Sequence, residues 1–314
     1  MPTLAHANHP LELEKLLTAS HENYDACIGH VAHQHSYVGV VANTRFHHLK
    51  FDANGQPKLE DLAKCLADHI VLYAVSSRNR PQLSTAQEWT RFVQDTRRLF
   101  RVNAQRRDLP DVSGEAGEML LYFLIEAVLG APQVVAKVEL KTNPAMEVNG
   151  SDGIHMRWHP TDEVVDVYFG ESKLYTDVGA ALTDAFDSIE KFHANGMRAH
   201  ELSMVTRLFK GADDELKKVI AEVLDSGKPG PGARINHACL IGYDWTATGL
   251  TPGLAAAAVE AEYKRQFLAE APALHQRLQT RFNTCHCRQY GFEVFFLPFV
   301  SVQAFRNAFK AAME

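Results

Sequence analysis

The segment Val164–Tyr175 (VVDVYFGESKLY) predicts a strand whose final residues differ in character from the rest of it. Side chains alternate between the two faces of a strand, so Glu171 and Lys173 point one way and Ser172 points the other. The face that carries Glu171 and Lys173 continues back through apolar residues, namely Phe169, Val167 and Val165. Two charges at the end of a buried face are costly unless they are paired or bound to a metal ion. The sequence therefore predicts a functional site at Glu171 and Lys173.

Two acidic segments precede this strand. Residues 114–118 (GEAGE) open an apolar helix, and residues 150–155 (GSDGIH) lie at the turn into another strand. Asp152 and Glu118 are the candidate further carboxylates, with Glu115 as the alternative acid on the helix. Two alternatives stay open, because Asp152 before a glycine also suits a turn and Glu115 also suits the positive end of a helix.

Two or three carboxylates form a hard oxygen site that suits Mg²⁺ or Mn²⁺. Such a metal polarises a phosphoryl oxygen and lowers the pKa of a bound water. A lysine beside it orients that water or stabilises the charge that develops on the phosphate. The residue types therefore favour phosphodiester hydrolysis.

The elements around the strand predict an α/β core. We expect a helix over residues 115–129, strands over 133–141, 153–159 and 164–175, a helix over 178–195 and a strand over 237–243. This is the order helix, three strands, helix, strand. Further helices are expected at 198–209, 213–225 and 253–281, before a closing strand at 293–300 and a helix at 302–312.

The first third of the chain predicts an N-terminal α/β accessory region over residues 1–108, followed by a second domain over 109–314. The accessory region is expected to contain helices at 12–22, 59–68 and 84–107, a strand or hairpin at 36–51 and a buried strand at 69–76. The boundary is placed where LPDVSGE interrupts the helical pattern with proline and glycine.

The amino-acid composition excludes several classes of protein. The 314 residues are 46% hydrophobic and 22% charged, which excludes a disordered or low-complexity chain. No apolar run approaches the roughly 18 residues of a membrane span, and the N-terminus lacks the pattern of a secretory signal. The five cysteines and this N-terminus favour a cytoplasmic location with free thiols. The net charge of −6 argues against a large basic face that wraps nucleic acid.

The ordered acids and the predicted core together resemble the PD-(D/E)xK nuclease superfamily. The resemblance implies a restriction-endonuclease-like core with an acid on the first helix, an aspartate on the second strand and (D/E)-x-K on the third. Those roles fall on Glu118, Asp152, and Glu171 with Lys173. The nominal proline before the aspartate is replaced by Ser151. The spacing of Gly114 and Glu118 is similar to the G-x-x-x-E motif of Holliday-junction resolvase relatives.

Longer strings resemble the HamA family, the nuclease subunits of Hachiman anti-phage systems. They are GEAGEMLLYFLIEAVLG, AKVELKTN, GSDGIH, FGESKLY and YGFEVFFLPFVSVQAFRNAF, all within residues 90–314. The resemblance implies a metal-dependent DNA endonuclease with Mg²⁺ or Mn²⁺ as cofactor, controlled by a superfamily 2 helicase subunit similar to HamB. Two alternatives stay open: a catalytically silent subunit that holds DNA or regulates the helicase, and a small-molecule enzyme that uses the same carboxylates.

Several other residues have less specific patterns. His155 is expected to be a structural histidine, and Lys137 and Lys141 lie either on a solvated strand edge or against a DNA backbone. The Cys285-His286-Cys287 cluster has the wrong spacing for a structural zinc site, even with His237 and Cys239 as a second pair. The chain has no phosphate-binding P-loop and no G-x-S-x-G elbow, which excludes a P-loop ATPase and the common serine hydrolases.

Overall fold

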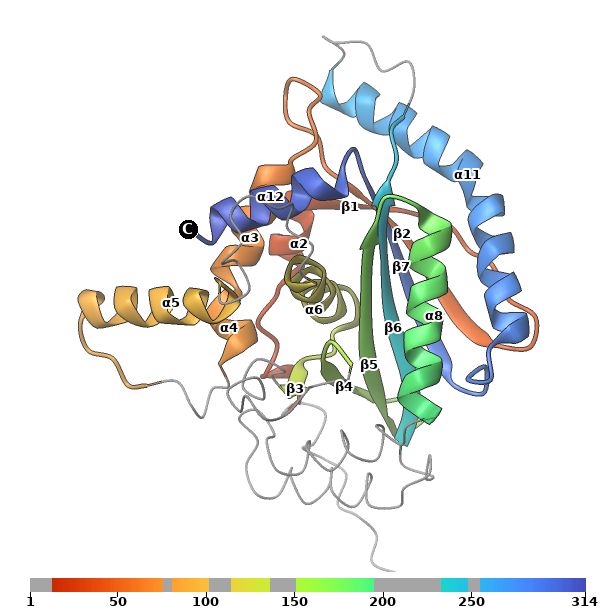
Figure 1. Ribbon diagram of the computed structural model, residues 1–314, viewed down its shortest axis with the longest axis horizontal. Coiled ribbons are helices and arrows are strands. Elements are labelled where there is room, and N and C mark those ends of the chain that lie inside the picture. The colour runs from red at the N-terminus through yellow and green to blue at the C-terminus, as the bar shows by residue number, and fades with distance from the viewer. Residues whose placement is uncertain (1–12, 76–80, 102–113, 136–150, 195–232, 248–254) are drawn as a thin grey trace, which may run out of the picture.

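A seven-stranded sheet with helices on both faces organises the part of the chain that the computed structural model describes, residues 13–75, 81–101, 114–135, 151–194, 233–247 and 255–314 (Figure 1). The strand order is β1-β2-β7-β6-β5-β4-β3. The strands are β1 (Ile28–Val31), β2 (Val41–Leu49), β3 (Gln133–Val135), β4 (Ile154–His159), β5 (Val164–Tyr175), β6 (Ala233–Asp244) and β7 (Gly291–Phe299). The helices are α2 (His21–Cys27), α3 (Leu59–Asp68), α4 (Ile70–Ala74), α5 (Ala86–Arg101), α6 (Glu115–Leu129), α8 (Val178–Ala194), α11 (Ala256–Thr284) and α12 (Val302–Ala312).

The centre of the sheet is parallel and its margins are antiparallel. Strands β2, β7, β6 and β5 run parallel to one another. At one margin β1 pairs with β2 antiparallel, and at the other β4 pairs with β5 and β3 pairs with β4 in the same way. Parallel strands need helical crossovers, and α8 supplies the one between β5 and β6.

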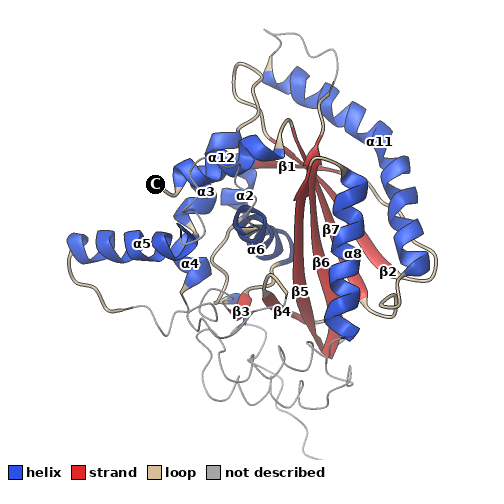
Figure 2. Ribbon diagram, viewed as in Figure 1, coloured by secondary structure: helices blue, strands red, loops and turns tan. Residues whose placement is uncertain are grey.

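Helices cover both faces of the sheet (Figure 2), and the two faces bury separate apolar layers. Helices α2, α3, α4, α6 and α12 lie on one side, and α8 and α11 lie on the other. Strand β7 shows the alternation that makes this possible, since Phe295 and Leu297 join the α6 layer while Val294 and Phe296 join the α8 and α11 layer. The site predicted on β5 therefore lies between two helical layers.

Strongly patterned segments fold as the sequence predicts. The bounds of α3, α6, α12 and β5 coincide with the expected ones, and α8, β4, β6 and β7 differ from theirs by a few residues. The order helix, three strands, helix, strand is present as α6, β3, β4, β5, α8 and β6. The α/β class is therefore confirmed, while membership of the PD-(D/E)xK superfamily stays a prediction.

Two expectations near the N-terminus are wrong. The buried strand expected at 69–76 is the short helix α4, whose buried residues Ile70, Tyr73 and Ala74 follow helical spacing and pack beside α6. A short apolar run is compatible with either element, and the helical neighbours decide. The helix expected at 12–22 is interrupted: residues 13–14 are helical, but the chain then turns, and Ser20 accepts a hydrogen bond from the backbone of Asn23 and so caps a separate helix that begins at His21.

Some predictions fall outside the described residues. They are the helices at 198–209 and 213–225, the boundary near residue 108, and Lys137 and Lys141. The division into residues 1–108 and 109–314 stays a prediction, although β1 and β2 of the first region belong to the same sheet as the rest. None of the described helices is both long and apolar enough to span a membrane.

Candidate active site

The candidate site lies at the end of β5 that follows its apolar stretch. Lys173 Nζ lies 2.8 Å from Glu171 Oε1, and the two side chains are 21% and 13% exposed. Ser172 points to the opposite face, where its hydroxyl lies against Gly117 of α6. The alternation predicted from the sequence is therefore confirmed, and the two charged side chains form a partly buried ion pair.

Asp152 is held against the same end of β5. The backbone N–H and the hydroxyl of Ser172 both donate to Asp152 Oδ2, at 2.7 Å and 2.6 Å. The backbone N–H of Asp152 donates to the carbonyl of Gly170 at 2.8 Å. The turn before β4 thus brings the predicted aspartate to the Glu-x-Lys segment, because β4 and β5 are antiparallel neighbours.

Among the described residues, carboxylates outnumber cations in this cluster. Burial and the negative charge of Asp152 raise the pKa of Glu171 to about 7, and Lys173 only partly opposes this. Burial lowers the pKa of Lys173, but the attraction of Glu171 and Asp152 outweighs burial and leaves that pKa above its ordinary value. Within the part of the chain that the structure describes, the Glu171 and Asp152 carboxylates lie near one lysine in a poorly solvated place, which favours an additional cation.

Glu118, in the first turn of α6, contacts a tyrosine that also lies near Asp152. The hydroxyl of Tyr73 donates to Glu118 Oε2 at 3.3 Å. Burial and the nearby carboxylates of Glu118, Asp152 and Glu115 hold the pKa of the Tyr73 phenol well above its ordinary value. Tyr73 therefore lies within the electric field of all three acids and connects the helix acids to Asp152.

The side chains at the site could supply some, but not all, of the ligands of a hard divalent cation. Within the described ranges, no group of three or more histidine, cysteine, aspartate or glutamate side chains is arranged to hold a metal ion. The pair Asp152 and Glu171 supplies carboxylate oxygens and excess negative charge, and Mg²⁺ commonly uses one or two protein carboxylates together with water and phosphate oxygens. Asp152 and Glu171 therefore have the ligand chemistry that such an ion prefers, and Glu118 contacts Tyr73.

Three residues that matter here were not singled out in advance. They are Ser172, which holds Asp152; Tyr73, which contacts Glu118; and Gly117, where an added Cβ would lie 3.1 Å from Ser172 Oγ. Ser172 has a signal in the sequence, since the middle position of Glu-x-Lys faces the helix. Tyr73 has none, because its role depends on how α4 packs.

The remaining candidates are structural. His155 is buried, and its Nδ1 lies 2.8 Å from the carbonyl oxygen of Ala131, which confirms the expected structural histidine. His237 contacts His193, with their Nε2 atoms 2.8 Å apart, and Cys239 is buried in the sheet.

One family comparison covers almost the whole chain. The model of the HamA family matches residues 27–313. The match begins well before residue 90, where the resemblance was expected to start, so most of the N-terminal region belongs to the family's conserved length. A search of the curated proteins finds no match.

Proposed function

This chain belongs to the HamA family of Hachiman defence proteins, and on that premise we propose that it is a metal-dependent DNA endonuclease that acts as the effector of an anti-phage complex. The observation that carries the proposal is the unbalanced cluster at the end of β5. There Glu171, with its pKa raised to about 7, lies close to Asp152 and is paired with Lys173.

The proposed roles follow from the contacts of each residue. Asp152 and Glu171 hold Mg²⁺ or Mn²⁺, and Ser172 keeps the Asp152 carboxylate at the end of β5. Bound metal supplies Lewis acidity at the phosphoryl oxygen and at a water. Lys173 holds the attacking water through its ammonium group. Glu118, oriented by Tyr73, completes or supports the acidic site, and Glu115 is the alternative helix acid.

A helicase partner of the HamB type is the second part of the proposal. Phosphate contacts dominate the affinity of proteins for DNA, and this chain has a net charge of −6. The carboxylates of the site add to the repulsion until a divalent cation offsets them. A superfamily 2 helicase that grips DNA would bring the substrate to an effector that binds it weakly alone.

The experiment is a cleavage assay on plasmid and linear DNA with Mg²⁺ or Mn²⁺, with and without the helicase partner and ATP. Removal of a metal-ligating carboxylate in Glu171→Gln is expected to lower the cleavage rate by at least about 100-fold. Loss of the water-orienting ammonium in Lys173→Met is expected to lower it by about 100-fold or more.

The matched control is Lys264→Met, which breaks the 2.7 Å ion pair with Glu260 on α11. It removes the same charge from a similar pair elsewhere, so cleavage is expected to stay within about twofold of the parent. Undiminished cleavage by folded Glu171→Gln and Lys173→Met proteins would refute the assignment of these residues.

One observation favours a second candidate function. Asp152 Oδ2 already accepts two hydrogen bonds, and in the described part of the chain no three ligating side chains converge. A catalytically silent subunit that holds DNA or regulates the helicase is compatible with such a site. This candidate predicts no cutting under any of the assay conditions, together with DNA binding by the complex.

A further inference from the structure

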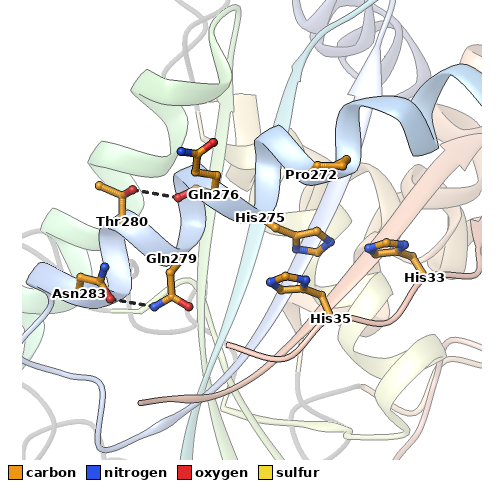
Figure 3. Close-up of a pocket in the computed structure, with 8 residues that line it drawn as sticks. All are labelled: His33, His35, Pro272, His275, Gln276, Gln279, Thr280 and Asn283. Carbon is orange, nitrogen blue, oxygen red and sulfur yellow. Dashed lines mark hydrogen bonds between the residues drawn. The ribbon is translucent and has the colours of Figure 1, made fainter. Parts of the chain in front are cut away.

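A pocket of about 500 Å³ lies away from the acidic cluster, between α11 and the segment that joins β1 to β2 (Figure 3). Three of its lining residues are histidines, two from the joining segment and one from α11. The lining residues are His33, His35, Pro272, His275, Gln276, Gln279, Thr280 and Asn283. A volume of this size is in the usual range of small-molecule sites, which is about 300–1,000 Å³.

The three imidazole rings form a stack. The ring centroids of His35 and His275 lie 4.0 Å apart with 13° between their planes, and those of His33 and His275 lie 4.7 Å apart at 20°. Flat, nearly parallel rings of this kind present their faces and edges to a pocket. The arrangement suits another flat ring better than a rounded or flexible ligand.

Two ring nitrogens in this stack lack partners. His275 is only 3% exposed, and its Nδ1 lies 2.5 Å from the hydroxyl oxygen of Tyr37, which fixes the ring. The Nε2 atoms of His275 and His33 are buried and have no hydrogen-bond partner among the described residues. A buried polar atom without a partner costs stability, and such a cost is more typical of a functional site than of a structural core.

The protonation state of the stacked histidines limits which ligands the pocket can bind. Burial and the neighbouring rings of His35 and His33 lower the pKa of His275 to about 4, so this ring is neutral near pH 7. Burial lowers the pKa of His33 as well. The residues that line the pocket include no lysine or arginine, so an anion lacks a counter-charge there.

A metal ion fits the geometry poorly. The lone pair of an imidazole nitrogen lies in the ring plane, so nitrogens of parallel stacked rings do not point at one centre. In agreement, the described residues contain no group of three potential ligands arranged for a metal. A neutral, flat molecule with hydrogen-bonding groups along its edge suits both an exposed ring face and the amide and hydroxyl side chains that line the pocket.

The wall of the pocket is held in place before any ligand binds. The side chain of Gln279 accepts a hydrogen bond from the backbone N–H of Val38 at 2.8 Å and donates to the carbonyl of Val38 at 3.2 Å. Gln279 also donates to Asn283 at 2.8 Å. These two hydrogen bonds to Val38 hold the joining segment against α11. The pocket is therefore formed before a ligand binds, and a preformed site loses less entropy on binding.

We propose that this pocket binds a nucleobase, which stacks on the exposed ring of His35 and bonds through its edge to the polar side chains that line the pocket. Bases commonly stack on histidine and aromatic side chains in proteins that take up unpaired nucleotides. The base can come from a free nucleotide or from a single strand of DNA. The inference stands on the pocket alone and does not require the chain to cleave DNA.

The test measures binding by the full chain. Deoxyadenosine monophosphate is titrated by calorimetry, with deoxyribose 5-phosphate as the ligand that lacks a base, and a fluorescein-labelled single-stranded oligodeoxyadenylate is followed by anisotropy. His35→Ala removes an exposed ring of the stack, and Thr280→Trp fills the pocket from its exposed rim. Each is expected to weaken base binding by at least about tenfold.

The matched control is His286→Ala, since that side chain is 92% exposed and lies outside the pocket. If the parent binds the mononucleotide and His35→Ala does not, the natural ligand is a free nucleotide. If the parent binds only the oligonucleotide, and His35→Ala again does not, the ligand is a strand of DNA. Equal binding by parent, His35→Ala and Thr280→Trp overturns the proposal, as does Zn²⁺ or phosphate binding that His35→Ala abolishes while the base is ignored. Glu171→Gln is expected to bind the base normally, so failure of the nuclease assignment is distinguishable.

Discussion

Strand β5 carries two charged clusters that differ in how well their charges are balanced. Near its beginning, Asp166 is 1% exposed and lies 2.6 Å from Arg234 Nε and 2.9 Å from Arg157 Nη2. Burial alone would raise the pKa of Asp166, but the two arginines outweigh burial and hold that pKa below its ordinary value. The buried Asp166 carboxylate thus contacts two arginines, of which Arg234 also pairs with the more exposed Asp162 at 2.7 Å.

In the cluster further along the strand, the described residues place two carboxylates near one lysine. Glu171 and Asp152 share Lys173, and the pKa of Glu171 is raised to about 7. The comparison teaches that burial of a carboxylate does not by itself indicate function. A carboxylate with sufficient counter-charge stabilises the fold, whereas one without it costs stability, and such a cost is typical of a site that binds or reacts.

Neutralising each carboxylate should therefore have opposite consequences for stability. Asp166→Asn leaves Arg157 and Arg234 without their common anion and is expected to lower the free energy of unfolding by about 3 kcal/mol. Glu171→Gln is expected to leave it unchanged or to raise it, because Lys173 keeps Asp152 nearby. Urea unfolding of the two amide variants beside the parent measures both values, and equal losses would remove the distinction between the clusters.

A divalent metal ion should stabilise the protein only through the cluster that contains Asp152 and Glu171. If Asp152 and Glu171 bind Mg²⁺, the ion stabilises the parent by about 2.7 kcal/mol when present at 100 times its dissociation constant. The gain should be absent in Glu171→Gln and retained in Asp166→Asn. Thermal unfolding with and without Mg²⁺ gives the shift, and a similar shift in all three proteins would place the metal elsewhere.

The pH dependence of stability should differ in the same way. The pKa of Glu171 is about 7 in the folded chain and near its ordinary value of 4.5 when unfolded, so the folded state holds an extra proton between these values. Its contribution is fully present below pH 4.5 and is lost as pH rises through about 7. The parent should therefore lose about 2 kcal/mol relative to Glu171→Gln between pH 5 and pH 8. Parallel pH profiles of parent and variant, from urea unfolding, would contradict this.

The smallest effect is expected where α6 approaches β5. A Cβ at Gly117 would lie 3.1 Å from Ser172 Oγ and 3.2 Å from Leu174 Cγ, so Gly117→Ala should cost about 1 kcal/mol through overpacking. Because Ser172 holds Asp152, the substitution should also weaken Mg²⁺ binding. The control is Gly39→Ala, where the added Cβ meets nothing within 4 Å although the positive φ of 75° makes it strained. Loss of stability without any change in Mg²⁺ affinity would show that Ser172 does not position Asp152.

The secondary structure was predictable wherever one segment carried its own periodic pattern. Helix α6, strand β5 and helix α12 have strong apolar patterns with clear ends, and their bounds coincide with the expected ones. The pattern failed at α4, where a short apolar run adopts whichever conformation its neighbours allow.

In the candidate site, too, local features were predictable from the sequence, whereas contacts between separate elements were not. Strand alternation is local, so the sequence alone determined that Glu171 and Lys173 share a face and that Ser172 opposes them. Only the tertiary structure decided that Ser172 holds Asp152 and that Tyr73 meets Glu118, since these contacts join separate elements. The ratio of charges in the cluster was likewise decided only by the tertiary structure. A pKa depends on burial and on all neighbouring charges, and these become known only when the strands and helices pack together.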